Sequence, residues 1–190
     1  MSEIVFLLEE ESMRELLREL LPRVLPEGIP YRLVPHEGKT DLERSLPRKL
    51  RAWRTPGVRF VVVRDKDSAD CRMLKKKLVG LCSEAGRHDT LVRIVCHHLE
   101  TWFLGDLAAV ERAFNLPGLG ANQGRRRYRN PDNIANASQE LKRLVPNYQK
   151  VNGARTIAPH LDPERNCSHS FGIFIAGLAR VVSEMTPGPR

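Results

Sequence analysis

The sequence contains no long apolar run and few cysteines. Acids directly follow the first apolar run, Ile4–Leu8, which is not typical of a secretory signal peptide. No stretch reaches the roughly 18 apolar residues that a membrane-spanning helix requires, so we expect a cytoplasmic protein with no membrane partner. The cysteines form no CxxC pair, which favours free thiols in a reducing compartment over a zinc site. They are Cys71, Cys82, Cys96 and Cys167.

Acidic residues are also in the minority. The 190 residues include 23 Asp and Glu against 31 Lys and Arg, which gives a formal net charge of +8. A basic excess suits a polyanionic partner, with nucleic acid (DNA or RNA) first and an acidic protein or membrane surface after it. The hydrophobic fraction of 41% is enough for a packed core. The length fits one domain, alone or with a small extension.

Short apolar runs alternate with helical patterns in the first part of the chain. Strands are expected at 4–8, 31–34, 59–63 and 91–96, and helices at 12–24, 42–53, 74–85 and 99–114. This alternation predicts an α/β fold of Rossmann-like type, with a mainly parallel four-stranded sheet flanked by helices. Pro22 is expected to end or kink the first helix, and Pro47 lies awkwardly inside the second. Ser12 with Glu15 has the spacing of a capping box, and Asp70 is an N-cap candidate.

The rest of the chain has no strand signal. Residues 115–130 are expected to form a loop, 131–145 a helix, and Phe171 to Val182 a final amphipathic helix. We therefore predict an α/β domain over 1–115 and a helical extension over 116–190 that packs on the same domain. The sequence does not indicate an oligomeric state.

Carboxylates follow the three clearest predicted strands. Glu9 comes after the first, Asp65 and Asp67 after the third, and Glu100 shortly after the fourth. Because parallel strands end at one edge of a sheet, these four acids are expected to converge there. Converging carboxylates repel one another, and a hard cation such as Mg²⁺, or Mn²⁺ in its place, compensates them. In extended geometry Asp65 and Asp67 would point to the same side.

A simpler interpretation of these acids stays open. Charged residues also cap strand ends and helix starts, and Glu10 and Glu11 are expected to do only that. Under this interpretation Glu100 would likewise only cap the start of a helix.

Several stretches of the chain resemble a known family. They are FLLEEESMRELL, HEGKTDLERSLPRKLRAW, RFVVVRDKDSADC, HLETWFLGD and YQKVNGARTIAPHLD. They are similar to a bacterial Toprim-like family of unknown function, related to the Toprim domains of topoisomerases, primases and overcoming-lysogenization-defect nucleases. The resemblance implies a Toprim-like fold and a catalytic, metal-binding set of Glu9, Asp65 and Asp67. It also implies that Glu100 is a further metal-binding acid.

Two residues depart from the pattern of this resemblance. Glu10 stands where Toprim domains have glycine, and His98 stands where close relatives have glutamate. Members of the family are often encoded beside an ATPase, as in two-part defence systems against phage. The resemblance therefore implies a separately encoded ATPase as a partner.

Basic residues and histidines supply further candidates. Lys39 follows the second strand, where it could meet a phosphate, and His36 could carry a proton. A polar loop capped by Thr40 or Asp41 is the alternative that we favour slightly. The adjacent His97 and His98 suggest zinc only weakly, because adjacent side chains rarely face one ion.

The basic run in the predicted loop is a candidate nucleic-acid contact. Its arginines could bind phosphates while its tyrosine stacks on a base, although a solvated loop or a surface for an acidic partner fits equally well. The run consists of Arg125, Arg126, Arg127, Tyr128 and Arg129, and weaker candidates are Lys150, Arg155 and His160.

Three functions follow from these features. The first is a divalent-metal-dependent nuclease of a bacterial, phage-defence type, in which the metal activates a water for phosphodiester hydrolysis. The second is a non-catalytic subunit that binds nucleic acid or an ATPase through its basic surface. The third, ranked well below them, is a haloacid-dehalogenase-like phosphatase, since VVVRDKDS resembles the nucleophile strand of that family.

Overall fold

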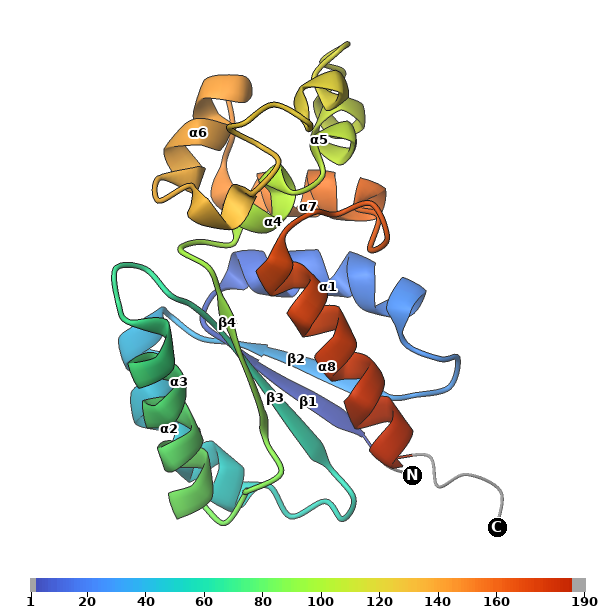
Figure 1. Ribbon diagram of the computed structural model, residues 1–190. Helices are drawn as coiled ribbons and strands as arrows, with labels where there is room; N and C mark the ends of the chain where they lie inside the picture. The colour runs from blue at the N-terminus through green and yellow to red at the C-terminus, as the bar shows by residue number, and fades with distance from the viewer. Residues whose placement is uncertain (1–2, 186–190) are drawn as a thin grey trace.

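Four parallel strands form a single sheet in the order β2-β1-β3-β4 (Figure 1). The computed structural model describes residues 3–185. The strands are β1 (Ile4–Leu8), β2 (Tyr31–Pro35), β3 (Arg59–Asp65) and β4 (Leu91–Val95). The α/β class and the parallel four-stranded sheet predicted from the sequence are confirmed.

Helices cover both faces of this sheet and one of its edges. The α-helices are α1 (Glu11–Val24), α2 (Lys39–Ala52), α3 (Cys71–Glu84), α4 (Glu100–Leu104), α5 (Leu107–Phe114), α6 (Ala137–Leu144), α7 (Lys150–Ile157) and α8 (His169–Met185). Short 3-10 helices are η1 (Gly120–Asn122), η2 (Pro131–Asn133) and η3 (Ala158–His160). Within residues 3–185, no helix is both long and apolar enough to cross a membrane.

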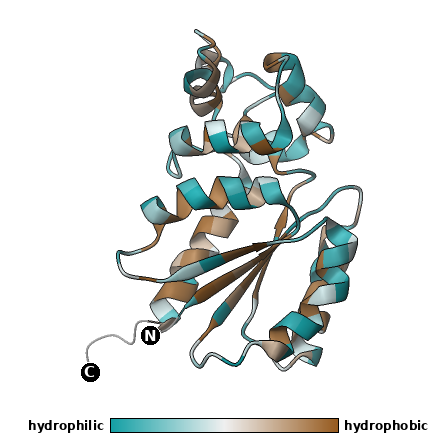
Figure 2. Ribbon diagram, turned by 180° about the vertical axis from the view of Figure 1, so that it is seen from behind, coloured by the Kyte–Doolittle hydropathy of each residue, from teal (hydrophilic) through white to brown (hydrophobic). Residues whose placement is uncertain are grey.

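The central strands are apolar on both sides because both of their faces are covered. Val5 and Leu7 of β1 face a core that α2 and α3 complete, whereas Ile4, Phe6 and Leu8 face a core completed by α1 and α8. Figure 2 shows the resulting brown strands enclosed between helices whose outer sides are teal. Burial on two sides explains why the strands were predictable as short continuous apolar runs.

The helices from α4 to α7 stack beyond the carboxyl ends of the strands, and α8 then returns along β4 (Figure 1). α7 packs on α1, and α8 packs on β4. A single hydrophobic core includes Leu17 of α1, Trp102 of α4, Ile157 of α7 and Phe171 of α8. The chain after residue 115 thus lies directly over the edge of the sheet where a functional site was expected.

Several helix boundaries differ from the prediction. The helix expected over 99–114 is broken into α4 and α5, because Asp106 starts a new helix by accepting a hydrogen bond from the backbone of Ala109 at 3.1 Å. At the break, a side chain at Gly105 would overlap Asn166. The helix expected over 131–145 begins only at Ala137, and α7 was not predicted. α1 and α2 both continue through their prolines, and α1 ends at Val24, where the apolar pattern placed its end, and not at Pro22.

One of the two predicted helix caps is confirmed. The Asp70 carboxylate accepts a hydrogen bond from the backbone of Met73 at 2.8 Å and caps α3. The predicted capping box at Ser12 is wrong, because α1 starts one residue earlier, with Glu10 at the N-cap position. Glu15 accepts a hydrogen bond from Arg155 of α7 at 2.6 Å instead of folding back on the helix start.

Candidate functional site

The carboxyl edge of the sheet brings Glu9 and Asp65 together. The two residues follow the adjacent strands β1 and β3, and the Glu9 side chain accepts a hydrogen bond from the Asp65 backbone at 2.9 Å. Both side chains are buried. Burial raises the pKa of Glu9, while the nearby Arg64 guanidinium and the Asp65 backbone amide oppose the shift.

Asp65 is the most strongly perturbed carboxylate of this site. Only 2% of its surface is exposed, and its Oδ1 has no hydrogen-bond partner within the described part of the chain. Burial raises the pKa of Asp65 well above its ordinary value, and the neighbouring charges of Glu10, Glu9 and Glu100 add to that shift. A buried, incompletely satisfied carboxylate among other carboxylates favours a positive charge nearby.

Glu100 approaches the same site from the start of α4. It is fully buried, and its Oε1 accepts a hydrogen bond from the Tyr148 hydroxyl at 3.3 Å. Its Oε2 has no hydrogen-bond partner in the described residues. Burial and the adjacent Glu100 charge both raise the pKa of Tyr148, so this hydroxyl remains a proton donor to Glu100.

Lys150 supplies the cation nearest to the buried acids. Its ammonium donates to the Glu10 carboxylate at 2.7 Å and lies 4.0 Å from Asp65 Oδ2. Burial opposes the charged form, but the hydrogen bond and charge of Glu10 outweigh it and raise the pKa of Lys150. The sequence had suggested Lys150 only as a weak nucleic-acid contact, and Glu10 only as a helix-capping acid.

Asp67 and His98 form the outer side of the site. The backbone of Asp67 is left-handed, with φ of 52°, so the predicted extended arrangement of Asp65 and Asp67 is wrong. Asp67 lies in a turn in which the Ala69 amide donates to the Lys66 carbonyl at 3.1 Å, and the Asp67 amide itself donates to the His97 carbonyl at 2.9 Å. His98 nevertheless joins the two acids, because its Nδ1 lies 3.9 Å from Asp65 Oδ2 and 3.7 Å from Asp67 Oδ1. Lys39 Nζ donates to Asp67 Oδ2 at 3.2 Å.

His36 is held between two fixed partners. Its Nδ1 donates to the Leu8 carbonyl at 2.8 Å, and its Nε2 accepts from the Lys49 ammonium at 2.7 Å. Burial lowers the pKa of His36, so the ring remains neutral and bridges β1 to α2. This arrangement gives His36 a structural role and leaves neither ring nitrogen free to carry a proton.

The basic run divides into buried and exposed members. Tyr128 is 7% exposed, and its hydroxyl donates to the buried Glu140. The prediction that Tyr128 stacks on a base is therefore wrong, because its ring belongs to the core. Arg127 also binds Glu140, through two nitrogens. The side chains of Arg125, Arg126 and Arg129 are exposed and form no ion pair among residues 3–185.

The donor set at the sheet edge fits a hard divalent cation. Two buried oxygens, Asp65 Oδ1 and Glu100 Oε2, lack hydrogen bonds, and carboxylate oxygens are the ligands that Mg²⁺ prefers. In the part of the chain that the structure describes, no three His, Cys, Asp or Glu side chains form a ready-made metal-binding group. Binding of an ion therefore requires side-chain rotation and movement of the Lys150 ammonium away from Asp65.

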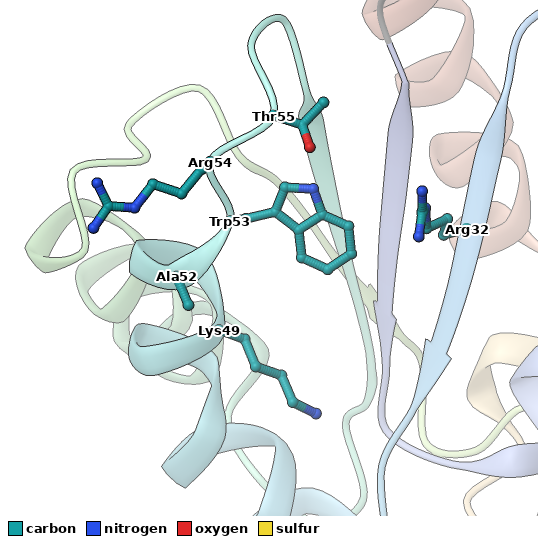
Figure 3. Close-up of a pocket in the computed structure, with 6 residues that line it drawn as sticks. All are labelled: Arg32, Lys49, Ala52, Trp53, Arg54 and Thr55. Carbon is teal, nitrogen blue, oxygen red and sulfur yellow. The ribbon is translucent and has the colours of Figure 1, made fainter.

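Hollows in the surface distinguish the two ends of the sheet. A pocket of about 490 Å³ opens beside the carboxylates and is lined by Lys66, Asp67 and His98, among others. Figure 3 shows another pocket, of about 330 Å³, where Trp53 and Arg54 follow α2. It lies at the opposite end of the sheet from Asp65, because α2 starts near the carboxyl end of β2 and ends just before β3 begins.

Comparison with known proteins identifies the family but no characterised relative. No curated protein and no solved structure matches the chain. The family model described as "Domain of unknown function (DUF4276)" matches residues 8–179. The chain therefore belongs to this family.

Proposed function

We propose that the protein is a divalent-metal-dependent phosphodiester hydrolase that acts on nucleic acid. The observation that carries this proposal is the burial of Asp65 among Glu9, Glu10 and Glu100, with one carboxylate oxygen unpartnered in residues 3–185. Such a cluster costs stability, and carboxylates perturbed in this way gather at functional sites. The resemblance of the segments around Glu9 and Asp65 to Toprim domains supports the same choice.

Glu9, Asp65 and Glu100 are the residues that would hold Mg²⁺ or Mn²⁺, with Asp67 at the outer side. When bound, the ion would lower the pKa of a water and stabilise charge on the phosphoryl oxygens. Glu9 is held in place by the Asp65 amide, and Glu100 is oriented by Tyr148.

The surrounding basic groups have separate tasks in this proposal. Lys39 and Lys150 border the acids and can bind the substrate phosphate. His98 lies within 4 Å of both Asp65 and Asp67, where its imidazole can hold or pass a proton.

A cleavage assay tests the proposed activity. Labelled single-stranded DNA, duplex DNA and RNA are incubated with the full chain and Mg²⁺ or Mn²⁺. We expect cleavage that chelation abolishes and that Asp65→Asn reduces by at least about 100-fold, because the substitution removes the central ligand charge. The matched control is Asp89→Asn, which changes an exposed aspartate paired with Arg59 away from the site and should retain activity.

A non-catalytic role is the second candidate, and one observation favours it. Lys150 already places a positive charge beside Glu10 and Asp65, which is how a purely structural carboxylate cluster would be neutralised. This candidate predicts nucleic-acid or ATPase binding that survives both Asp65→Asn and Glu9→Gln, with no cleavage by any variant. Capture of an aspartyl-phosphate on Asp65 would instead support the phosphatase hypothesis.

A further inference from the structure

Three neighbouring hollows of the surface share lining residues and follow one another toward the carboxylates. The first, of about 490 Å³, includes Asp67 and His98. The second, of about 370 Å³, shares Ala135 and Asn136 with the first. The third, of about 520 Å³, shares Arg127 and Ile134 with the second. We call this row of three hollows, from Asp67 past η2 and α6, the arginine–amide groove.

The arginine–amide groove carries a positive charge. Arg127 and Arg143 both line it and both bind the single carboxylate of Glu140, which is 4% exposed. Two guanidiniums against one buried carboxylate leave one positive charge, and both arginine side chains remain more than half exposed. Arg126 adds an exposed guanidinium without an ion pair in the described residues, and Lys66 adds an ammonium at the inner end.

Side-chain amides account for much of the remaining lining. They are Asn130, Asn133, Asn136 and Gln139. Each amide offers both donors and an acceptor, which suits the varied edges of unpaired bases. Among the described residues, the lining of these three hollows includes no Phe, Tyr or Trp. Recognition here would therefore depend on phosphate contacts and hydrogen bonds rather than on stacking platforms.

The shape of the groove favours one strand over two. Hollows of a few hundred Å³ are the size that encloses small molecules, and a chain of them can hold successive nucleotides with their bases turned inward. Readers of duplex DNA instead insert a protruding helix or ribbon into the major groove. The described residues present a concave surface here, lined by the turn at η2 and the side of α6.

We propose that a single strand of nucleic acid lies in the arginine–amide groove. At the inner end of the groove, beside Asp67 and His98, the strand delivers one phosphate to the carboxylate site. The position of that reacting phosphate rests on the proposed function. Occupation of the groove is a separate property that can be measured without catalysis.

Fluorescence anisotropy tests this inference with the full chain. The probes are labelled 20-nucleotide single strands of DNA and RNA and the corresponding duplexes, in buffer with a chelator and in the Asp65→Asn background to prevent cleavage. Arg126→Glu reverses an exposed charge in the groove. Arg54→Glu is the matched control, since Arg54 is exposed and lines the pocket at the opposite end of the sheet.

We expect Arg126→Glu to weaken single-strand binding at least about 10-fold and Arg54→Glu less than about 2-fold. The slope of log affinity against log salt should fall by at least about 0.7 for the lost phosphate contact. Asn136→Asp, which keeps a residue suited to the N-cap position of α6, should also weaken binding through charge repulsion. Duplexes should bind more weakly than single strands.

The inference is overturned if Arg126→Glu and Asn136→Asp bind as the parent does, if Arg54→Glu is equally damaging, or if duplexes bind as tightly as single strands. Groove-dependent binding without any metal-dependent cleavage would support the groove and refute the proposed activity. With Asp65 intact, cleavage that neither Arg126→Glu nor Asn136→Asp reduces would refute the groove alone.

Discussion

A single residue, Asp65, combines burial with an unsatisfied charge. Its carboxylate lies among Glu9, Glu10 and Glu100, and the Lys150 ammonium offsets part of their charge. The folded pKa of Asp65 is therefore above its value in an unfolded chain. Its contribution favours folding when Asp65 is protonated and is lost as the pH rises through the folded pKa.

Asp65→Asn should consequently stabilise the protein in metal-free buffer. We expect a higher melting temperature than wild type at neutral pH, because the amide removes the buried charge, and a smaller gain as the pH falls and wild-type Asp65 becomes protonated. Thermal unfolding followed by circular dichroism between pH 4 and 8 measures this difference. Asp89→Asn should show no such pH-dependent gain, and a destabilised Asp65→Asn would contradict the assigned electrostatics.

Sequence reasoning located the acids but not the groups that hold them. Glu9, Asp65 and Glu100 were predictable because parallel strands end at one edge and each acid directly follows an apolar run or a helix start. Tyr148 and Lys150 were not, because they reach the site from α7 and the turn before it, through packing that no local pattern encodes. The prediction that Tyr128 stacks on a base was wrong for the same reason, since the partner of its hydroxyl, Glu140, lies on α6.

At the scale of elements, α7 connects the helical part to the carboxylates. It begins at Lys150 and packs on α1, and Gly153 of α7 faces the ring of Tyr148. A methyl group at Gly153 would overlap this buried ring, so the glycine is required for the ring that orients Glu100 to lie close to the helix.

Gly153→Ala should therefore destabilise the fold by about 2 kcal/mol through overpacking, despite the better helix propensity of alanine. Gly80 provides the control, because it lies inside α3 and no neighbouring atom comes within 4 Å of the place that an alanine methyl would take. Gly80→Ala should stabilise by about 0.5–1 kcal/mol. Urea unfolding measures both changes, and equal stabilisation by the two substitutions would show that Tyr148 is not confined as described.

Strands were predicted more accurately than helices for a physical reason. β1 and the middle of β3 are buried on both faces, so β1 is apolar throughout, β3 has a continuous apolar run over 60–63, and the signal is local. The break between α4 and α5 depends on Asp106, whose carboxylate accepts hydrogen bonds from the Ala109 amide and from Arg165, far along the chain. Periodicity could not show this break, because both short helices continue the same apolar pattern.

At the scale of the whole molecule, the candidate site is built from both ends of the chain. Glu9, Asp65 and Glu100 come from the part predicted as an α/β domain, whereas Tyr148 and Lys150 come from the part predicted as a helical extension. The arginine–amide groove also lies mainly on the later part. The helices after residue 115 thus complete the site as well as cover the edge of the sheet.

The central claim is that the carboxylates around Asp65 form a cation site. Calorimetric titration of the metal-free protein with Mn²⁺ tests this claim most directly. We expect saturable binding to the wild type, at least about 10-fold weaker binding to Asp65→Asn, and tighter binding to Lys150→Ala, because this ammonium competes for the same carboxylates. Equal affinities for all three proteins, or no binding to any of them, would contradict the account.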